Sequence, residues 1–147
     1  MRKSVYIGMG LFCVSFFFIH CSIAQTQQTV EPLPDITLTI PENADHITYL
    51  GLTGKAGEPF KLTDINADVL MIELFSMYCP YCQKAAPVVN ELYELMEKRS
   101  GPDMKLVIIG IGANNTDLEV KTFQEGFDIQ FPMFSDPDMS IYKILAG

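Results

Sequence analysis

The sequence predicts an α/β fold, with a central sheet flanked by helices. Two mostly apolar runs, 69–75, which contains one acid, and 105–112, are each followed by a segment with helical periodicity. Continuous apolar runs are typical of strands that helices cover on both faces, as in parallel sheets. The order strand, helix, strand, helix therefore favours parallel pairing. We expect one domain, covering residues 36–147, because the chain is long enough for a single core.

Residues 1–24 have the pattern of a secretory signal peptide. Arg2 and Lys3 precede an apolar run at 5–19, and small residues then lead to Ala24. We expect cleavage after Ala24, which would place the mature chain in the periplasm or elsewhere outside the cytoplasm. The alternative is a retained membrane anchor, because the apolar run is close to the shortest helix that can span a bilayer.

Cleavage would leave a strongly acidic mature chain. The formal charge would change from −8 to −10, because two of the 10 basic residues leave while all 18 acidic residues remain. No basic stripe is present in the sequence, and we therefore expect no nucleic-acid partner.

The four cysteines divide between the signal peptide and the mature chain. Cleavage would remove Cys13 and Cys21 and leave only Cys79 and Cys82, in a C-x-x-C motif. A disulfide across so short a loop restrains the unfolded chain very little, so a purely structural role is poorly motivated. The pair therefore predicts redox chemistry in an exported protein.

Short strands are predicted before the first apolar run. Residues 25–35 are polar, contain two prolines and are predicted to form a linker. Residues 36–40 and 47–52 are rich in β-branched and aromatic residues, which favours two strands. A turn with glycines and a proline then leads to the segment 60–65.

Cys79 and Cys82 are predicted to lie at the start of a helix that covers about 80–99. Residues three apart lie on one helical face, so the sulfurs can form and break a disulfide with little backbone movement. Pro80 suits the first turn, where its missing N–H has no helical partner. Unpaired backbone N–H groups and the helix dipole favour a thiolate at Cys79. Cys82, one turn further, is expected to be more buried and to act as the resolving thiol.

The rest of this helix is predicted from its periodicity and its breakers. Pro87 should bend the helix by removing one backbone hydrogen bond, and Gly101 should stop it. The predicted buried face consists of the apolar residues at helical spacing. These residues are Val88, Leu92, Leu95 and Met96.

Three further elements are predicted after the second apolar run. Thr116, with Glu119 three residues later, forms a capping box, so a helix should start there. Residues 131–134 form a strand candidate. The Ser-Asp-Pro sequence is typical of a helix start and predicts a last helix over about 137–145.

The apolar strand, the C-x-x-C motif and Pro87, five residues after Cys82, together resemble the thioredoxin superfamily. Within it, residues 33–147 are most similar to the TlpA/ResA-like branch of extracytoplasmic redoxins. The resemblance implies a thioredoxin-like fold with a central mixed sheet. It also implies activity as a thiol–disulfide oxidoreductase. We expect no cofactor and no resident metal.

The resemblance adds further residues to the predicted site. Glu73 stands where thioredoxins carry a buried acid, six residues before the first cysteine. Tyr78 takes the place of the usual tryptophan, and the Pro80-Tyr81 dipeptide is familiar from glutaredoxins. Burial among leucine and isoleucine should raise the pKa of Glu73, so that it can take a proton from the resolving thiol. The alternative is a surface-facing Glu73 paired with a lysine such as Lys84.

The resemblance also implies elements that the sequence does not contain. Thioredoxin-like domains continue with a cis-proline loop, two antiparallel strands and a last helix, whereas this sequence stops at Gly147. We therefore expect a fold without the C-terminal hairpin and last helix, in which 69–75 is an exposed edge strand. A truncated chain, or an inactive thioredoxin-like fragment, is a further alternative.

The predicted activity is disulfide reduction by dithiol exchange. The Cys79 thiolate would attack the disulfide of a client, and Cys82 would then release the reduced client. The resemblance implies disulfide-bearing or dithiol client proteins, including those of cytochrome c maturation, and a membrane-embedded thiol electron donor. The alternatives are a copper carrier that uses the two thiolates with Met77, and a thiol peroxidase, suggested by Ser76 three residues before the first cysteine.

Overall fold

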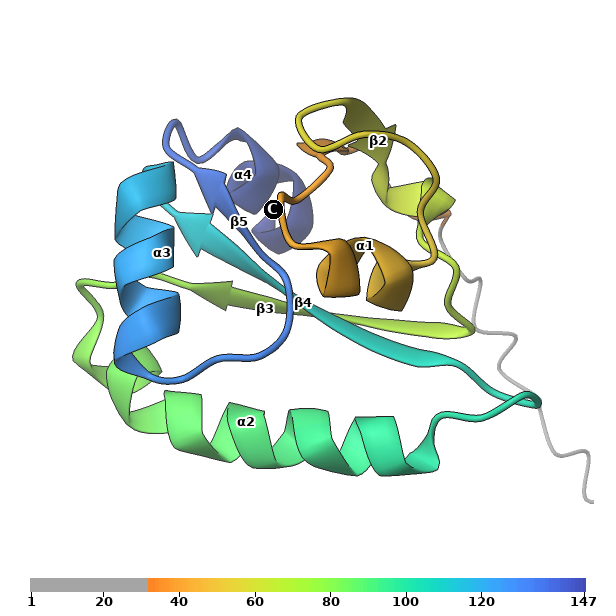
Figure 1. Ribbon diagram of the computed structural model, residues 1–147. Helices are drawn as coiled ribbons and strands as arrows, with labels where there is room; N and C mark the ends of the chain where they lie inside the picture. Colours follow the sequence, from red (N-terminus) through yellow and green to blue (C-terminus); the bar gives the residue numbers. More distant parts are fainter. Residues whose placement is uncertain (1–31) are drawn as a thin grey trace, which may run out of the picture. The chain divides into compact units, whose positions relative to one another are not determined.

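The computed structural model describes residues 32–147. Figure 1 shows a sheet with helices on both faces, which confirms the predicted α/β arrangement. The predicted signal peptide, 1–24, lies outside the described residues, as does most of the predicted linker, 25–35. Within the described part, no helix combines the length and the apolar character needed to cross a bilayer.

The central sheet consists of three parallel strands in the order β3-β4-β5. The strands are β3 (Val69–Phe75), β4 (Leu106–Ala113) and β5 (Met133–Asp136). Val69 pairs with Leu106, and Phe75 pairs with Gly112, so β3 and β4 stay in register along the whole of β3. Among residues 32–147, no strand pairs with the outer edge of β3, as expected.

The N-terminal part contains a short antiparallel sheet and a helix. Its elements are β1 (Thr37–Thr39), α1 (Ala44–Leu50), β2 (Pro59–Lys61) and the 3-10 helix η1 (Leu62–Asp64). Strand β1 pairs with β2. The predicted strand at 36–40 is therefore confirmed in its central residues.

The prediction of a strand at 47–52 is wrong, because most of this segment belongs to α1. The side chain of Asn43 caps the helix by accepting a hydrogen bond from the Asp45 backbone N–H at 2.8 Å. Gly51, with a φ of 70°, adopts the left-handed conformation that ends the helix. These end signals outweigh the strand preference of the β-branched and aromatic residues between them.

The helix after the cysteines, α2 (Pro80–Arg99), has the predicted bounds and includes Pro87. Its predicted buried face is only partly correct. Met96 is buried and Leu92 is half-buried, but Val88 and Leu95 are 64% and 53% exposed. The other residues of α2 that contact the core are Cys82, Ala86, Val89 and Tyr93. The true face is rotated toward Val89 and Tyr93, so Val88 and Leu95 lie outside it.

Helix α3 (Asp117–Gly126) begins at the predicted capping box. The Glu119 carboxylate accepts a hydrogen bond from the Thr116 backbone N–H at 2.7 Å. The Thr116 hydroxyl accepts one in return from the Glu119 backbone N–H at 3.4 Å. Two donors at the start of the helix, which have no helical partner, are satisfied in this way.

The last helix, α4 (Ser140–Ala146), begins later than the predicted position at 137. Ser135 and Asp136 belong to the end of β5 instead. The buried Asp136 carboxylate accepts hydrogen bonds from the backbone N–H groups of Ile141, at 3.1 Å, and Tyr142, at 2.8 Å. A side chain of the preceding strand therefore satisfies the start of α4, in place of the predicted cap.

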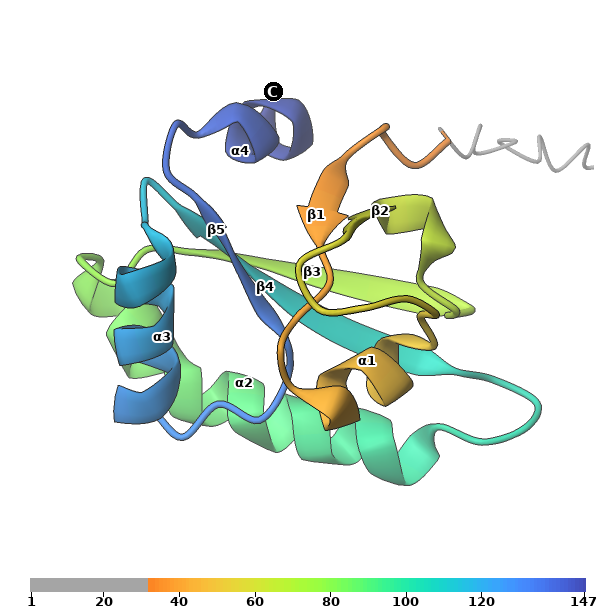
Figure 2. The same ribbon diagram turned by 45° about the horizontal axis from the view of Figure 1, so that its top comes forward.

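The two faces of the sheet pack into two separate core clusters. Successive strand side chains point to opposite faces, so alternate residues of β3 divide between the clusters. The cluster with α1 and α4 includes Leu70, Ile72 and Leu74. The cluster with α2 and α3 includes Met71 and Phe75. Figure 2 shows α4 above the sheet and α2 below it. By the same alternation, Glu73 faces α2.

Gly112 lies in β4 where side chains approach its backbone closely. A Cβ at this position would lie 2.7 Å from Val120 Cγ2 and 3.0 Å from Phe75 Cζ. We expect Gly112→Ala to lower the free energy of unfolding, measured by urea denaturation, by about 1–3 kcal/mol. Gly126→Ala is the control, because a Cβ there meets nothing within 4 Å and alanine favours the helix. Equal losses in both variants would contradict this packing.

Candidate active site

The candidate site lies at the carboxyl ends of β3 and β4. Residues 76–78 lead from β3 to the start of α2, and residues 114–116 lead from β4 to α3. Neighbouring parallel strands end at the same edge, so the two loops meet there. Both cysteines of the described part lie at this edge.

Cys79 is the N-cap residue of α2, and Pro80 occupies the first turn, as predicted. The Cys79 sulfur accepts a hydrogen bond from the Cys82 backbone N–H, with 3.4 Å between sulfur and nitrogen. The pKa of Cys79 is lowered, first because the Cys82 thiol donates a hydrogen bond to it and next because of this backbone N–H. The backbone N–H of Tyr81 acts in the same direction. The start of α2 therefore favours the thiolate form of Cys79.

Cys82 lies one turn further along α2 and packs against the core cluster on that side of the sheet. Burial raises the pKa of Cys82, and the hydrogen bond that its thiol donates to Cys79 raises it further. The negative charge of Glu73 acts in the same direction. The structure thus brings the two thiols together in opposite environments, one that favours the thiolate and one that favours the neutral thiol.

Glu73 lies in the middle of β3, opposite Gly110 of β4. Its Oε2 atom is buried and has no hydrogen-bond partner among the described residues. Burial raises the pKa of Glu73. The alternative prediction, a surface-facing Glu73 paired with a lysine such as Lys84, is wrong, because the Oε2 atom is buried and has no hydrogen-bond partner among the described residues. The ion pairs of the described part do not include Glu73.

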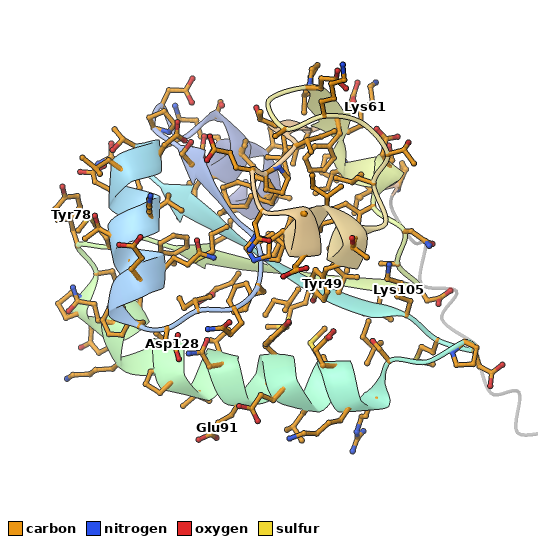
Figure 3. All side chains as sticks on the ribbon, viewed as in Figure 1. Tyr49, Lys61, Tyr78, Glu91, Lys105 and Asp128 are labelled. Atoms are coloured by element: carbon orange, nitrogen blue, oxygen red, sulfur yellow. The ribbon has the colours of Figure 1, made fainter. Side chains whose placement is uncertain are left out.

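Two exposed tyrosines lie close to Cys79 in the sequence. Tyr78 and Tyr81 are 63% and 81% exposed. The Tyr78 hydroxyl donates a hydrogen bond to the Glu119 carboxylate, which raises the pKa of Tyr78 and lowers that of Glu119. Figure 3 shows Tyr78 at the edge of the molecule, beside α3. Pro87, the last residue of the predicted site, is exposed further along α2.

Polar residues that hold the loop before Cys79 were not predicted from the sequence. The Asn115 Oδ1 accepts a hydrogen bond from the Met77 backbone N–H at 2.9 Å. The Gln83 Nε2 donates to the Met77 carbonyl at 2.7 Å. Glu119 was predicted only as a helix cap. A signal for Asn115 was present, because a polar residue directly after a buried parallel strand lies at the edge where sites form.

The site consists of two thiols without a ready set of metal ligands. Within residues 32–147, no group of three or more histidine, cysteine, aspartate and glutamate side chains could hold a metal ion. Met77, the methionine considered for a copper site, packs its side chain against the core cluster on the α2 side.

The chain resembles a protein family and several curated proteins in sequence. The profile of the AhpC/TSA family matches residues 31–145. The thiol-disulfide oxidoreductase ResA of Bacillus thuringiensis is 28% identical over 92 residues, which are 63% of this chain and 50% of that protein. The ResA of Geobacillus thermodenitrificans is 26% identical over 85 residues, which are 58% of this chain and 46% of that protein. The chain thus spans about half the length of these relatives.

Solved structures resemble the chain in fold. A Bacteroides thetaiotaomicron protein, proposed to be a protein disulfide isomerase, has a TM-score of 0.57 and 21% identity, covering 77% of this chain and 60% of its own. The thioredoxin domain of a Bacteroides vulgatus thiol-disulfide oxidoreductase has a TM-score of 0.51 and 13% identity, covering 78% of this chain and 73% of its own. These similarities confirm the predicted thioredoxin-like fold.

Replacing Glu73 by glutamine should change how stability depends on pH. Burial raises the pKa of Glu73 in the folded chain, so the folded state keeps a proton that the unfolded state loses above about pH 4.3. The wild-type chain should therefore lose stability relative to Glu73→Gln as the pH rises from about 4.3 to the pKa of Glu73 in the folded chain. The gap should become constant above the folded-state pKa. Urea denaturation of both chains at a series of pH values measures this difference in the free energy of unfolding.

Glu91→Gln is the matched control for this prediction. Glu91 is exposed on α2 and points away from the sheet (Figure 3), so its replacement removes a charge without relieving burial. We expect no comparable gap for the control. A gap for Glu73→Gln that is absent, or that shrinks as the pH rises, would show that burial does not disfavour the charged carboxylate.

Proposed function

The chain belongs to the AhpC/TSA family, and we propose that it is an extracytoplasmic thiol–disulfide oxidoreductase that reduces protein disulfides. The observation that carries this proposal is the pair of thiols at the start of α2. Cys79 and Cys82 are linked by a hydrogen bond, and their pKa values move in opposite directions. Such a pair supplies one reactive thiolate and one thiol that stays protonated until it is needed.

Exchange proceeds in two displacement steps. In the first, the Cys79 thiolate attacks one sulfur of the client disulfide, a bond forms between Cys79 and the client, and one client thiolate leaves. In the second, Cys82 loses its proton and attacks the Cys79 sulfur, which releases the second client thiolate. The client gains two electrons, and the two cysteines of the enzyme end as a disulfide.

Glu73 is the group that takes the proton from Cys82. Glu73 and Cys82 lie on the same side of the sheet, and the charge of Glu73 is the smallest of the effects that raise the pKa of Cys82. Burial holds the pKa of Glu73 above its usual range and thus closer to that of a thiol, which makes the transfer less unfavourable. The buried Oε2, which has no partner among the described residues, is available to accept the proton.

The proposed clients are disulfide-bearing proteins outside the cytoplasm, including oxidised apocytochromes. The predicted signal peptide, 1–24, supports export to an oxidising compartment, where a reductase needs electrons delivered across the membrane. A membrane-embedded thiol donor is the proposed source. The exposed Tyr78 and Tyr81, on either side of Cys79 in the sequence, offer aromatic surface that a client polypeptide can contact. The ResA relatives are themselves named thiol-disulfide oxidoreductases.

Variants that lack one cysteine of the pair test the order of attack. The folded, reduced variants are mixed with a peptide that contains one disulfide, and peptide mass spectrometry locates the adduct on Cys79 or Cys82. Cys82→Ser should accumulate a mixed disulfide through Cys79, because the thiol that would release the peptide is absent. Cys79→Ser should form much less adduct, because Cys82 is partly buried and its raised pKa keeps the thiol protonated. The reverse pattern would exchange the two roles, and no adduct with either variant would rule out the proposed chemistry.

A further inference from the structure

The loop that follows β4 holds the loop that presents Cys79. Asn115 is completely buried, and its Oδ1 accepts a hydrogen bond from the Met77 backbone N–H at 2.9 Å. Its Nδ2 donates to the Asn114 carbonyl at 3.0 Å. One amide side chain therefore ties together two loops whose contacting residues are 38 positions apart.

The backbone of Met77 is held from both sides. Besides the contact with Asn115, the Met77 carbonyl accepts a hydrogen bond from the Gln83 Nε2 at 2.7 Å. Two residues further on, Cys79 donates its backbone N–H to the Ser76 carbonyl at 3.0 Å. These contacts fix the loop between the end of β3 and the start of α2. The loop, in turn, sets where the Cys79 sulfur meets the first N–H groups of the helix.

The Asn115 side chain is closely packed, and both of its polar atoms have hydrogen-bond partners. A Cβ on Gly112 would lie 3.1 Å from the Asn115 Cβ, so this glycine allows the loop to fold against the sheet. Asn114 adopts a left-handed φ of 56°, a conformation that asparagine tolerates better than most residues. A buried amide is favourable only when its polar atoms are bonded, and both polar atoms of Asn115 are bonded to backbone groups.

We propose that Asn115 is a positioning residue for thiol–disulfide exchange, which holds Met77 so that Cys79 stays at the mouth of α2. The inference rests on the proposed function for its catalytic consequence, whereas its geometry stands independently. Asn115 contacts neither sulfur and acts through the backbone of Met77. Glu119 supports the same loop from α3 through its hydrogen bond with Tyr78.

An asparagine suits this position because it is neutral. Its oxygen accepts from the Met77 N–H, and its nitrogen donates to the Asn114 carbonyl, without adding a charge. An aspartate would keep the acceptor. However, it would place a negative charge beside the loop that carries Cys79, where it would oppose formation of the thiolate.

The test is the pH profile of Cys79 alkylation by iodoacetamide, followed by peptide mass spectrometry on the reduced full chain. In Asn115→Ala the Met77 N–H loses its acceptor, and we expect the profile to move to higher pH. At pH values below the pKa of Cys79, the rate should fall about tenfold for each unit of this shift. Asn115→Ser shortens the side chain and so also withdraws the acceptor from the Met77 N–H. It should move the profile in the same direction, and it provides the test if the alanine variant does not fold.

Asn90→Ala is the matched control. The Asn90 Nδ2 donates to the Phe127 carbonyl at 2.9 Å, so this residue also ties a distant backbone group to α2, but at a different point of the helix. We expect it to lower the free energy of unfolding and to leave the Cys79 profile unchanged. Unchanged profiles in folded Asn115→Ala and Asn115→Ser would overturn the proposal.

The proposed function and the positioning role fail in different ways. A shifted profile in the Asn115 variants, together with a wild-type chain that exchanges no disulfide, would support the positioning role and refute the proposed function. Normal exchange by the wild-type chain, with equal profiles and equal stability losses in Asn115→Ala and Asn90→Ala, would leave Asn115 with a structural role alone and overturn this inference.

Discussion

The hydrogen bond from the Cys82 backbone N–H to the Cys79 sulfur is the contact on which the site depends. It forms because Cys79 is the N-cap of α2, where the first N–H groups have no carbonyl partner within the helix. Pro80 occupies a position at which a missing N–H is harmless. The pKa values of the two thiols differ as a result. The hydrogen bond from the Cys82 thiol, followed by the one from its backbone N–H, lowers the pKa of Cys79, while burial raises that of Cys82.

The rest of the fold keeps this helix start in place. Parallel pairing of β3 with β4 brings two loops to one edge of the sheet, and the loop after β4 supplies Asn115. The strand before the helix contributes Glu73, which faces α2 because Met71 and Phe75 do. A slip of β3 by one residue would turn all of these side chains to the opposite face, so strand register and site chemistry are linked.

Local signals predicted those parts of the structure that local interactions determine. The capping box at Thr116 and the bounds of α2 depend on groups within a few residues, and the structure confirms both. Two predictions failed where other signals prevailed. Asn43 and Gly51 form the two ends of α1, although the segment between them has the composition of a strand. Asp136, within β5, determined how the last helix begins.

The chemical groups of the candidate site were easier to predict than the residues that hold them in position. A C-x-x-C motif and an acid within an apolar run stand out in a sequence, so the cysteines and Glu73 could be proposed as members of the candidate site. The contact between Asn115 and Met77 depends on the pairing of two strands, which no local pattern encodes. Packing also decided which side of α2 is buried, since Val88 and Leu95 have helical spacing but are exposed.

The redox equilibrium of the Cys79–Cys82 pair against glutathione tests the proposed reductase most directly. Reduction of protein disulfides requires a strongly reducing pair, and we predict a potential close to about −270 mV. A value close to about −120 mV would identify an oxidant that installs disulfides and would contradict the proposed direction of electron flow. A folded chain whose pair showed no defined potential would contradict dithiol chemistry altogether.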